Sequence, residues 1–146
     1  MAFRFALASV LKYRQDLEHR ELLRLEQRYA ELAAAQAEFW KAEENIVLAR
    51  KEREHTLSQG TTAVHLQLAL EYDAQLRRRR ESSQKALAEA QASLRQQLQA
   101  YHQARQSRDA LEELRKKQFE AYRKEEGRSE QRQRDELFLL RRRARR

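Results

Sequence analysis

The feature that most limits what this chain can fold into is its shortage of turn-forming residues. The 146 residues include two glycines and no proline, whereas hairpins, barrels and sandwiches need such residues between their strands. Ala, Glu, Leu, Lys, Arg and Gln dominate the sequence instead, and this composition is typical of long helices and coiled coils. We therefore expect an all-α protein.

One short cluster of small polar residues, residues 56–62, interrupts the helical pattern and contains Gly60. A glycine in the left-handed conformation commonly ends a helix, and Thr61 or Thr62 is suited to cap the next one. Because the turn between the helices is short, they are expected to fold back antiparallel as one coiled-coil hairpin over residues 1–146.

The predicted boundaries follow from this single turn. The first helix covers about residues 5–57, the turn about 58–62, the longer second helix about 63–138, and a basic tail residues 141–146. Gly127 costs about 1 kcal/mol relative to alanine inside a helix. Since no other breaker stands beside it, we interpret it as a weak point and not as an end.

Both predicted helices carry a series of mostly apolar residues that recur alternately three and four positions apart. In the first helix the series is Leu22, Leu25, Tyr29, Leu32, Gln36, Phe39, Glu43 and Ile46. In the second it is Leu87, Ala90, Leu94, Gln97, Tyr101, Ala104, Arg108 and Leu111. This period of 3.5 residues predicts the seam of a left-handed coiled coil, which its polar members weaken.

The charge of the chain is concentrated toward its C-terminal end. The formal net charge is +8, made up of zero over residues 1–60, +3 over residues 61–127 and +5 over residues 128–146. A basic segment attracts nucleic acid, acidic lipid or an acidic protein surface, and charge alone does not choose among them. Neither a membrane-spanning run nor a secretory signal is visible, so a cytoplasmic protein is expected.

The residues that an enzyme needs are not arranged in any recognisable pattern. Cysteine is absent, and the four histidines show no zinc-site spacing. His55 and His65 flank the turn, but solvated histidines are favoured over a metal site there. Two isolated glycines cannot form a phosphate-binding loop. We expect no catalytic residue, no metal and no cofactor, and an independent enzyme is not predicted.

Three apolar clusters exceed what a simple coiled coil needs, two of them near the N-terminus and the start of the second helix. The N-terminal cluster, with Phe3 and Phe5 at its start, fits a hydrophobic staple and a docking site equally well. At the start of the second helix, Leu68, Tyr72 and Leu76 lie four residues apart on one face. One seam cannot bury this face together with that of Leu66 and Leu70, so an exposed partner surface is favoured over packing at the turn.

The far end of the second helix holds a third cluster, in which Phe119, Tyr122 and residues 137–140 lie between basic runs. Docking into another protein or against a membrane surface would bury it. A further basic run, residues 77–80, covers the whole circumference of a helix. We interpret that run as a solvated turn in preference to a phosphate site.

Both ends of the sequence resemble the FliJ family of flagellar type III export proteins. The N-terminal resemblance rests on Phe3-Arg4-Phe5 and on residues 10–14, Val-Leu-Lys-Tyr-Arg. The C-terminal resemblance rests on residues 111–117, Leu-Glu-Glu-Leu-Arg-Lys-Lys, and then on Tyr122, Glu125, Glu126, Gln131, Asp135 and Glu136. The resemblance extends over essentially the whole chain, and Gly127 is a departure within the closing segment.

The resemblance implies a fold and a function. FliJ proteins are antiparallel two-helix coiled coils similar to the central shaft of rotary ATPases. The family is expected to enter the ring of the hexameric export ATPase, FliI, to promote its assembly, to contact the cytoplasmic part of the export gate protein FlhA, and to escort export chaperones. It implies a location at the inner face of the cell membrane, reached through these partners, at the flagellar base.

Matched to this sequence, the resemblance implies an ATPase-ring site formed from both ends. Its residues are Phe3, Phe5, Val10, Leu11, Tyr13, Arg14, Tyr122, Glu126, Gln131, Asp135 and Glu136. The assignment of Leu68, Tyr72 and Leu76 to the export gate comes from their spacing and not from the resemblance.

Three other interpretations remain open at this point. The equivalent stalk of a virulence secretion system would share the architecture. A basic coiled-coil nucleic-acid binder is less favoured, because specific nucleic-acid binding calls for a basic face with stacking aromatics and the aromatics here are scattered. A homodimeric structural coiled coil would require its helices to continue unbroken through Gly60.

Overall fold

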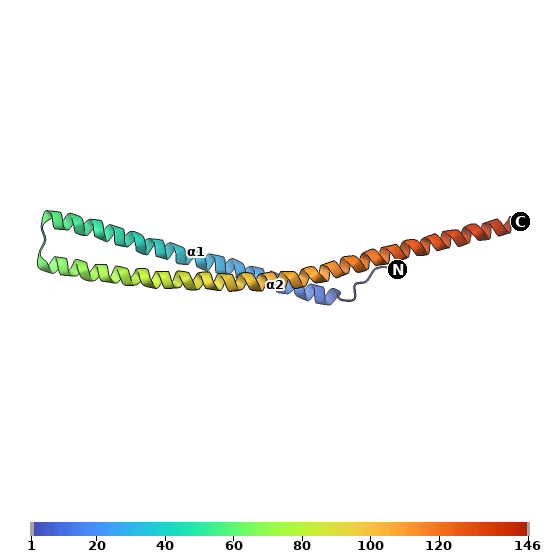
Figure 1. Ribbon diagram of the computed structural model, residues 1–146, viewed down its shortest axis with the longest axis horizontal. Helices are drawn as coiled ribbons and strands as arrows, with labels where there is room; N and C mark the ends of the chain where they lie inside the picture. Colours follow the sequence, from blue (N-terminus) through green and yellow to red (C-terminus); the bar gives the residue numbers. More distant parts are fainter. Residues whose placement is uncertain (1, 146) are drawn as a thin grey trace. The chain divides into compact units, whose positions relative to one another are not determined.

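The computed structural model describes residues 2–145 and contains two long α-helices. Helix α1 spans Ala8–Gln59 with 52 residues, and helix α2 spans Ala63–Ala144 with 82 residues (Figure 1). No strand occurs within residues 2–145. The predicted all-α fold with a longer second helix is therefore confirmed.

The turn between the helices has the predicted chemistry. Gly60 adopts a φ of 84°, in the left-handed region that glycine enters without steric cost, and its N–H donates to the carbonyl of Leu57 at 3.4 Å. Thr62 then caps α2, because its hydroxyl oxygen accepts the N–H of His65 at 3.3 Å. The chain reverses here, so an unbroken helix through Gly60 is excluded.

The helix ends differ from the predicted ones at both termini. Helix α1 begins at Ala8 and not near residue 5, since the Ala8 N–H donates to the Phe5 carbonyl at 3.2 Å in a turn that precedes the helix. Helix α2 continues past Gly127 and past residue 138 as far as Ala144. Three of the arginines assigned to a separate tail, residues 141–143, form its last turn, where positive charge favours the helix dipole.

The chain divides into two compact units. The turn unit comprises Arg20–Tyr101, and the terminal unit comprises the described parts of residues 1–19 and 102–146. In the turn unit the two helices run antiparallel side by side from the turn (Figure 1). Its most buried side chains are Leu25, Ala42 and Leu76, with exposed fractions of 7%, 8% and 3%.

The terminal unit has a smaller core, formed where the N-terminal segment meets α2. Phe5 and Leu11 are 9% and 4% exposed. The ring of Phe3 lies edge-on to Phe119, with centroids 5.3 Å apart, and 5.6 Å from the ring of Tyr122. Beyond Tyr122, every described residue of α2 is exposed.

The predicted seam is confirmed in α2 and only partly in α1. All eight predicted seam residues of α2, from Leu87 to Leu111, are half-buried. In α1, Tyr29 is 50% exposed and Gln36 is also exposed, so their assignment to the seam is wrong. Ala35 and Ala42 occupy the inward positions instead, because small side chains let the two helices approach closely.

Candidate interaction surfaces

The polar residues of the seam in the turn unit are paired across the two helices. Arg53 donates to the Asp73 carboxylate at 2.6 Å, and Arg80 forms an ion pair with Glu43. The side-chain amide of Gln97 donates to the backbone carbonyl of Glu21 at 3.0 Å and also to its carboxylate. Paired polar layers of this kind fix the register of a helix pair, so these residues do more than weaken the seam.

An equivalent layer in the terminal unit centres on Arg108. Its Nε lies 2.6 Å from a carboxylate oxygen of Glu18, and its guanidinium also contacts Asp109 at 3.1 Å and Glu112 at 3.4 Å. Burial by itself lowers the pKa of Arg108, but attraction to Glu18, Glu112 and Asp109 outweighs it, and the net pKa is raised. Arg108 is therefore a permanent cation that holds α1 to α2 in this unit.

The N-terminal residues predicted to face an ATPase ring divide into buried and exposed groups. Phe5 and Leu11 belong to the core of the terminal unit and offer almost no surface. Val10 and Tyr13 are 40% and 58% exposed, and the half-buried Arg14 places its guanidinium 6.0 Å from the centre of the Tyr13 ring. The accessible surface of this group is therefore centred on Tyr13.

The predicted ring-facing residues on the C-terminal side lie along α2 in the same unit. Phe3 contacts Tyr122 directly, so the structure brings the two ends of the predicted site together at this point. The Tyr122 hydroxyl donates to Glu126 at 3.3 Å, and burial, followed by the negative charge of Glu126, raises the pKa of Tyr122.

The remaining C-terminal residues of the predicted site are exposed positions further along α2. Gln131 donates to Asp135 at 3.1 Å, and Glu136 is exposed beside them. Among the described residues, no hydrogen bond or ion pair joins these three side chains to the N-terminal segment. They extend the site along the helix and do not join the cluster around Phe3.

The apolar patch predicted at the start of α2 is only partly exposed. Leu68 and Tyr72 are 56% and 52% exposed, whereas Leu76 is 3% exposed. The prediction of a surface containing all three is therefore wrong for Leu76, whose inward heptad position places it in the core of the turn unit. Leu70, on the neighbouring face, is 55% exposed, so apolar surface remains available here.

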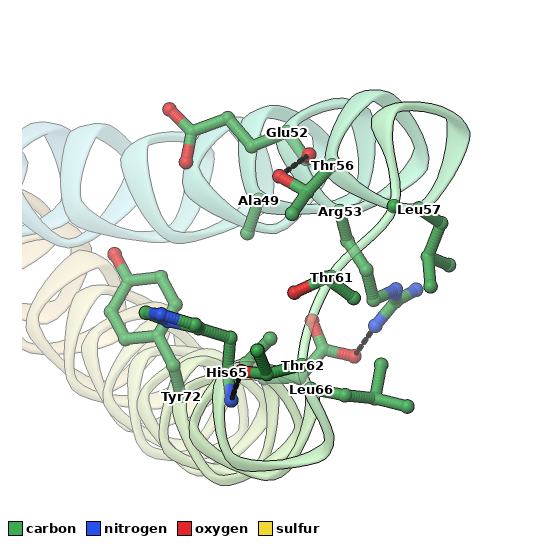
Figure 2. Close-up of a pocket in the computed structure, with 13 residues that line it drawn as sticks. Ala49, Glu52, Arg53, Thr56, Leu57, Thr61, Thr62, His65, Leu66 and Tyr72 are labelled. Atoms are coloured by element: carbon green, nitrogen blue, oxygen red, sulfur yellow. Dashed lines mark hydrogen bonds and ion pairs between the residues drawn. The ribbon is translucent and has the colours of Figure 1, made fainter.

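A shallow pocket opens beside the turn, between the last turns of α1 and the first turns of α2 (Figure 2). Leu57 and Leu66 line it together with the paired Arg53 and Asp73. His65 also lines the pocket, yet no group of three potential metal ligands occurs anywhere in residues 2–145. No sequence motif marked this pocket, because its shape depends on how α1 and α2 diverge on either side of the turn.

Sequence reasoning also missed an aromatic residue on the outside of α1. Trp40 is 68% exposed and its ring lies edge-on to Phe39, with centroids 5.6 Å apart. Val47 and Leu48, seven and eight positions on, are 49% and 50% exposed. Their spacing marks a second apolar stripe beside the seam, a signal that a search for one stripe per helix overlooks.

Comparison with known proteins identifies the family. Within residues 2–145, neither helix has a segment apolar and long enough to cross a membrane. No curated protein matches the chain, and no solved structure does. The family model described as "Flagellar FliJ protein" matches residues 3–146, which include the N-terminal cluster, the turn and the whole of α2. The chain therefore belongs to the FliJ family of flagellar export proteins.

Proposed function

We propose that this protein is a non-enzymatic stalk of the flagellar export apparatus, which binds the ring of the hexameric export ATPase (FliI) through its terminal unit and promotes assembly of the ring. The observation that carries this proposal is the contact of Phe3 with Phe119 and Tyr122. This contact joins the N-terminal segment to the part of α2 that begins the ring-facing series. A match to a flagellar family over residues 3–146 supports a flagellar apparatus in preference to a virulence system.

The chemistry of the terminal unit suits binding without catalysis. Its accessible side chains are a few apolar and aromatic groups, such as Val10 and Tyr13, among many charged ones. A helix surface of this kind makes modest contacts with each of several equivalent subunits. A ligand changes the populations of its receptor's states only by binding one state better than another. We propose that the stalk acts on the ATPase in this way.

The turn unit is proposed to link the ATPase to the export gate. Leu68 and Tyr72 leave apolar surface exposed on α2, and exposed apolar surface is typical of a protein contact. We assign this surface to the cytoplasmic domain of FlhA, and we also propose that the protein escorts export chaperones. The protein would then be held at the inner face of the membrane, at the flagellar base, through these partners.

The experiment compares Tyr13→Ala with Tyr72→Ala in two assays. Both tyrosines are more than half exposed, at 58% and 52%, so neither change removes core packing. Tyr13→Ala is expected to lower stimulation of the export ATPase at least about fivefold, as for an aromatic anchor at an interface, and to leave capture by the FlhA cytoplasmic domain unchanged. Tyr72→Ala is expected to weaken capture by the FlhA cytoplasmic domain and to leave stimulation of the ATPase unchanged.

Circular dichroism provides the control for folding, because both variants should keep the helical content of the original protein. Phe5 is unsuitable for this test since it is buried in the terminal unit. If the Tyr13→Ala protein is folded and still stimulates the ATPase as strongly as the original protein, the assignment of the terminal unit to the ring is refuted.

A further inference from the structure

We propose that the end of α2, residues 137–145, binds the surface of an anionic lipid bilayer directly. The first observation is an uncovered apolar run. Leu137, Phe138, Leu139 and Leu140 are 55%, 66%, 56% and 60% exposed. Four such neighbours in succession expose far more apolar surface than isolated surface leucines do, and surfaces of this kind mark interaction sites.

The second observation is the charge beside this run. Residues 137–145 contain four arginines and no acidic residue. Upstream, Arg132 and Arg134 have carboxylate partners, Glu125 at 3.4 Å and Glu130 at 3.8 Å. Within the described chain, no ion pair is found for residues 141–143. The charge of these guanidinium groups is thus available to an external anion, and the planar fork of Arg suits phosphate oxygens.

The third observation is how the two kinds of side chain are distributed around the helix. Leu137, Leu140 and Ala144 are three and seven residues apart and share one face of α2, whereas Phe138 and Leu139 lie on the other faces of the helix. Arg141 and Arg143 follow within one turn and flank that face on either side. Their long stems can therefore run along the apolar surface while the charged ends reach the lipid phosphates.

A bilayer surface satisfies the face of Leu137, Leu140 and Ala144 and the flanking arginines at once. Nucleic acid would neutralise the arginines but leave the leucines in water, and an acidic protein surface would do the same. The apolar run is far shorter than the roughly 20 residues of a spanning helix, so the segment is expected to lie in the interface and not to cross it. Juxtaposed basic and apolar residues are typical of peripheral contact with anionic lipid.

The test is flotation of the full-length protein with vesicles. Binding is expected to vesicles of 30% phosphatidylglycerol in phosphatidylcholine, not to pure phosphatidylcholine, and to weaken with salt. Replacing Arg141, Arg142 and Arg143 by glutamine is expected to weaken binding at least about tenfold. The matched control replaces Arg77, Arg78 and Arg79, an exposed arginine run in the turn unit, by glutamine and is expected to change binding less than about twofold.

The double substitution Leu137→Ser and Leu140→Ser tests the apolar contribution separately. It is expected to weaken vesicle binding at least about tenfold, because it removes apolar burial. The control is Val47→Ser with Leu48→Ser, a comparably exposed apolar pair in α1. The proposal is overturned if the protein does not float with anionic vesicles, or if the two arginine triples weaken binding equally. It is also overturned if the leucine changes do not weaken vesicle binding. A further contradictory result would be duplex DNA that binds more tightly than the vesicles and whose binding the leucine changes do not affect.

This inference does not depend on the ATPase. The vesicle variants change residues 137–143, whereas the ATPase test changes Tyr13, so failure of one proposal is separable from failure of the other.

Discussion

The two units of the protein use the same helix α2 in different ways. In the turn unit α2 is paired with α1 along a heptad seam, with Leu76 buried and each polar layer closed by a partner on the other helix. In the terminal unit pairing ends near Tyr122, and the exposed continuation relies on its own ion pairs, such as Glu130 with Arg134. Each such pair contributes only about 0.2–0.5 kcal/mol.

This difference indicates where stability and function lie. Helices of this length gain most of their stability from packing an apolar face, so the turn unit is expected to be the more stable part. The end of α2 is expected to open first, because it has few buried contacts. The exposed side chains of the terminal unit that are proposed to contact partners lie close to this less stable end of α2.

The largest expected effect is loss of core packing in the turn unit. Leu76→Ala removes a side chain that is 3% exposed and is expected to lower the free energy of unfolding by about 2–5 kcal/mol. The matched change Leu139→Ala, at a site that is 56% exposed, should alter it by less than about 0.5 kcal/mol. Urea unfolding followed by circular dichroism measures both, and equal effects would contradict the contrast between the units.

A smaller loss is expected from breaking the polar layer of the terminal unit. Arg108→Ala leaves the half-buried Glu18 without its partner at 2.6 Å and is expected to cost about 1–3 kcal/mol. Arg132→Ala removes an exposed pair and should cost no more than about 1 kcal/mol. A double-mutant cycle with Glu18→Ala isolates the pairing energy, and a coupling near zero would show that the layer is not stabilising.

The two glycines are expected to respond to alanine in opposite directions. Gly127→Ala places a methyl group in open space within α2 and should stabilise the helix by about 0.5–1 kcal/mol. Gly60→Ala forces alanine to a φ of +84° and should destabilise the turn by about 1–2 kcal/mol. Amide hydrogen exchange across residues 120–135 and 55–66 locates each effect, and the same sign at both sites would be inconsistent with this structure.

The smallest effect concerns pH. Burial and then Glu126 raise the pKa of Tyr122 above its ordinary value of about 10. Because the folded pKa is the higher one, the contribution of Tyr122 to stability is complete below about pH 10 and is lost as pH rises through the folded value. In an alkaline absorbance titration Tyr122→Phe should remove a late-titrating tyrosine, and Glu126→Gln should move that titration to lower pH.

Much of the fold was predictable because the sequence contains so few breakers. A single cluster around Gly60 specified the turn, and the α2 seam from Leu87 to Leu111 followed from its regular spacing of three and four residues. The α1 seam was harder. Its alanines at positions 33–35 and its apolar residues Phe39 and Trp40 fit adjacent registers equally well, so periodicity alone assigned Tyr29 and Gln36 to the wrong face.

The candidate surfaces were less predictable than the fold. Sequence spacing placed Leu76 with Leu68 and Tyr72, but burial depends on the partner helix, and α1 covers Leu76 alone among the three. Likewise, the packing of Phe5 in the terminal core depends on a long-range contact between the N-terminal segment and α2. The family resemblance supplied which residues to consider, and the structure distinguishes those that are accessible, such as Tyr13, from those that are not.

The central claim is that the N-terminal segment folds onto α2 within one chain, because this contact joins the two ends of the proposed ring site. Nuclear Overhauser effects between the Phe3 ring and the rings of Phe119 and Tyr122 test it most directly, since their centroids lie 5.3 and 5.6 Å from that of Phe3. Both effects are expected in the monomer, and the first should disappear in Phe119→Leu. Their absence from a fully helical monomer would contradict the account.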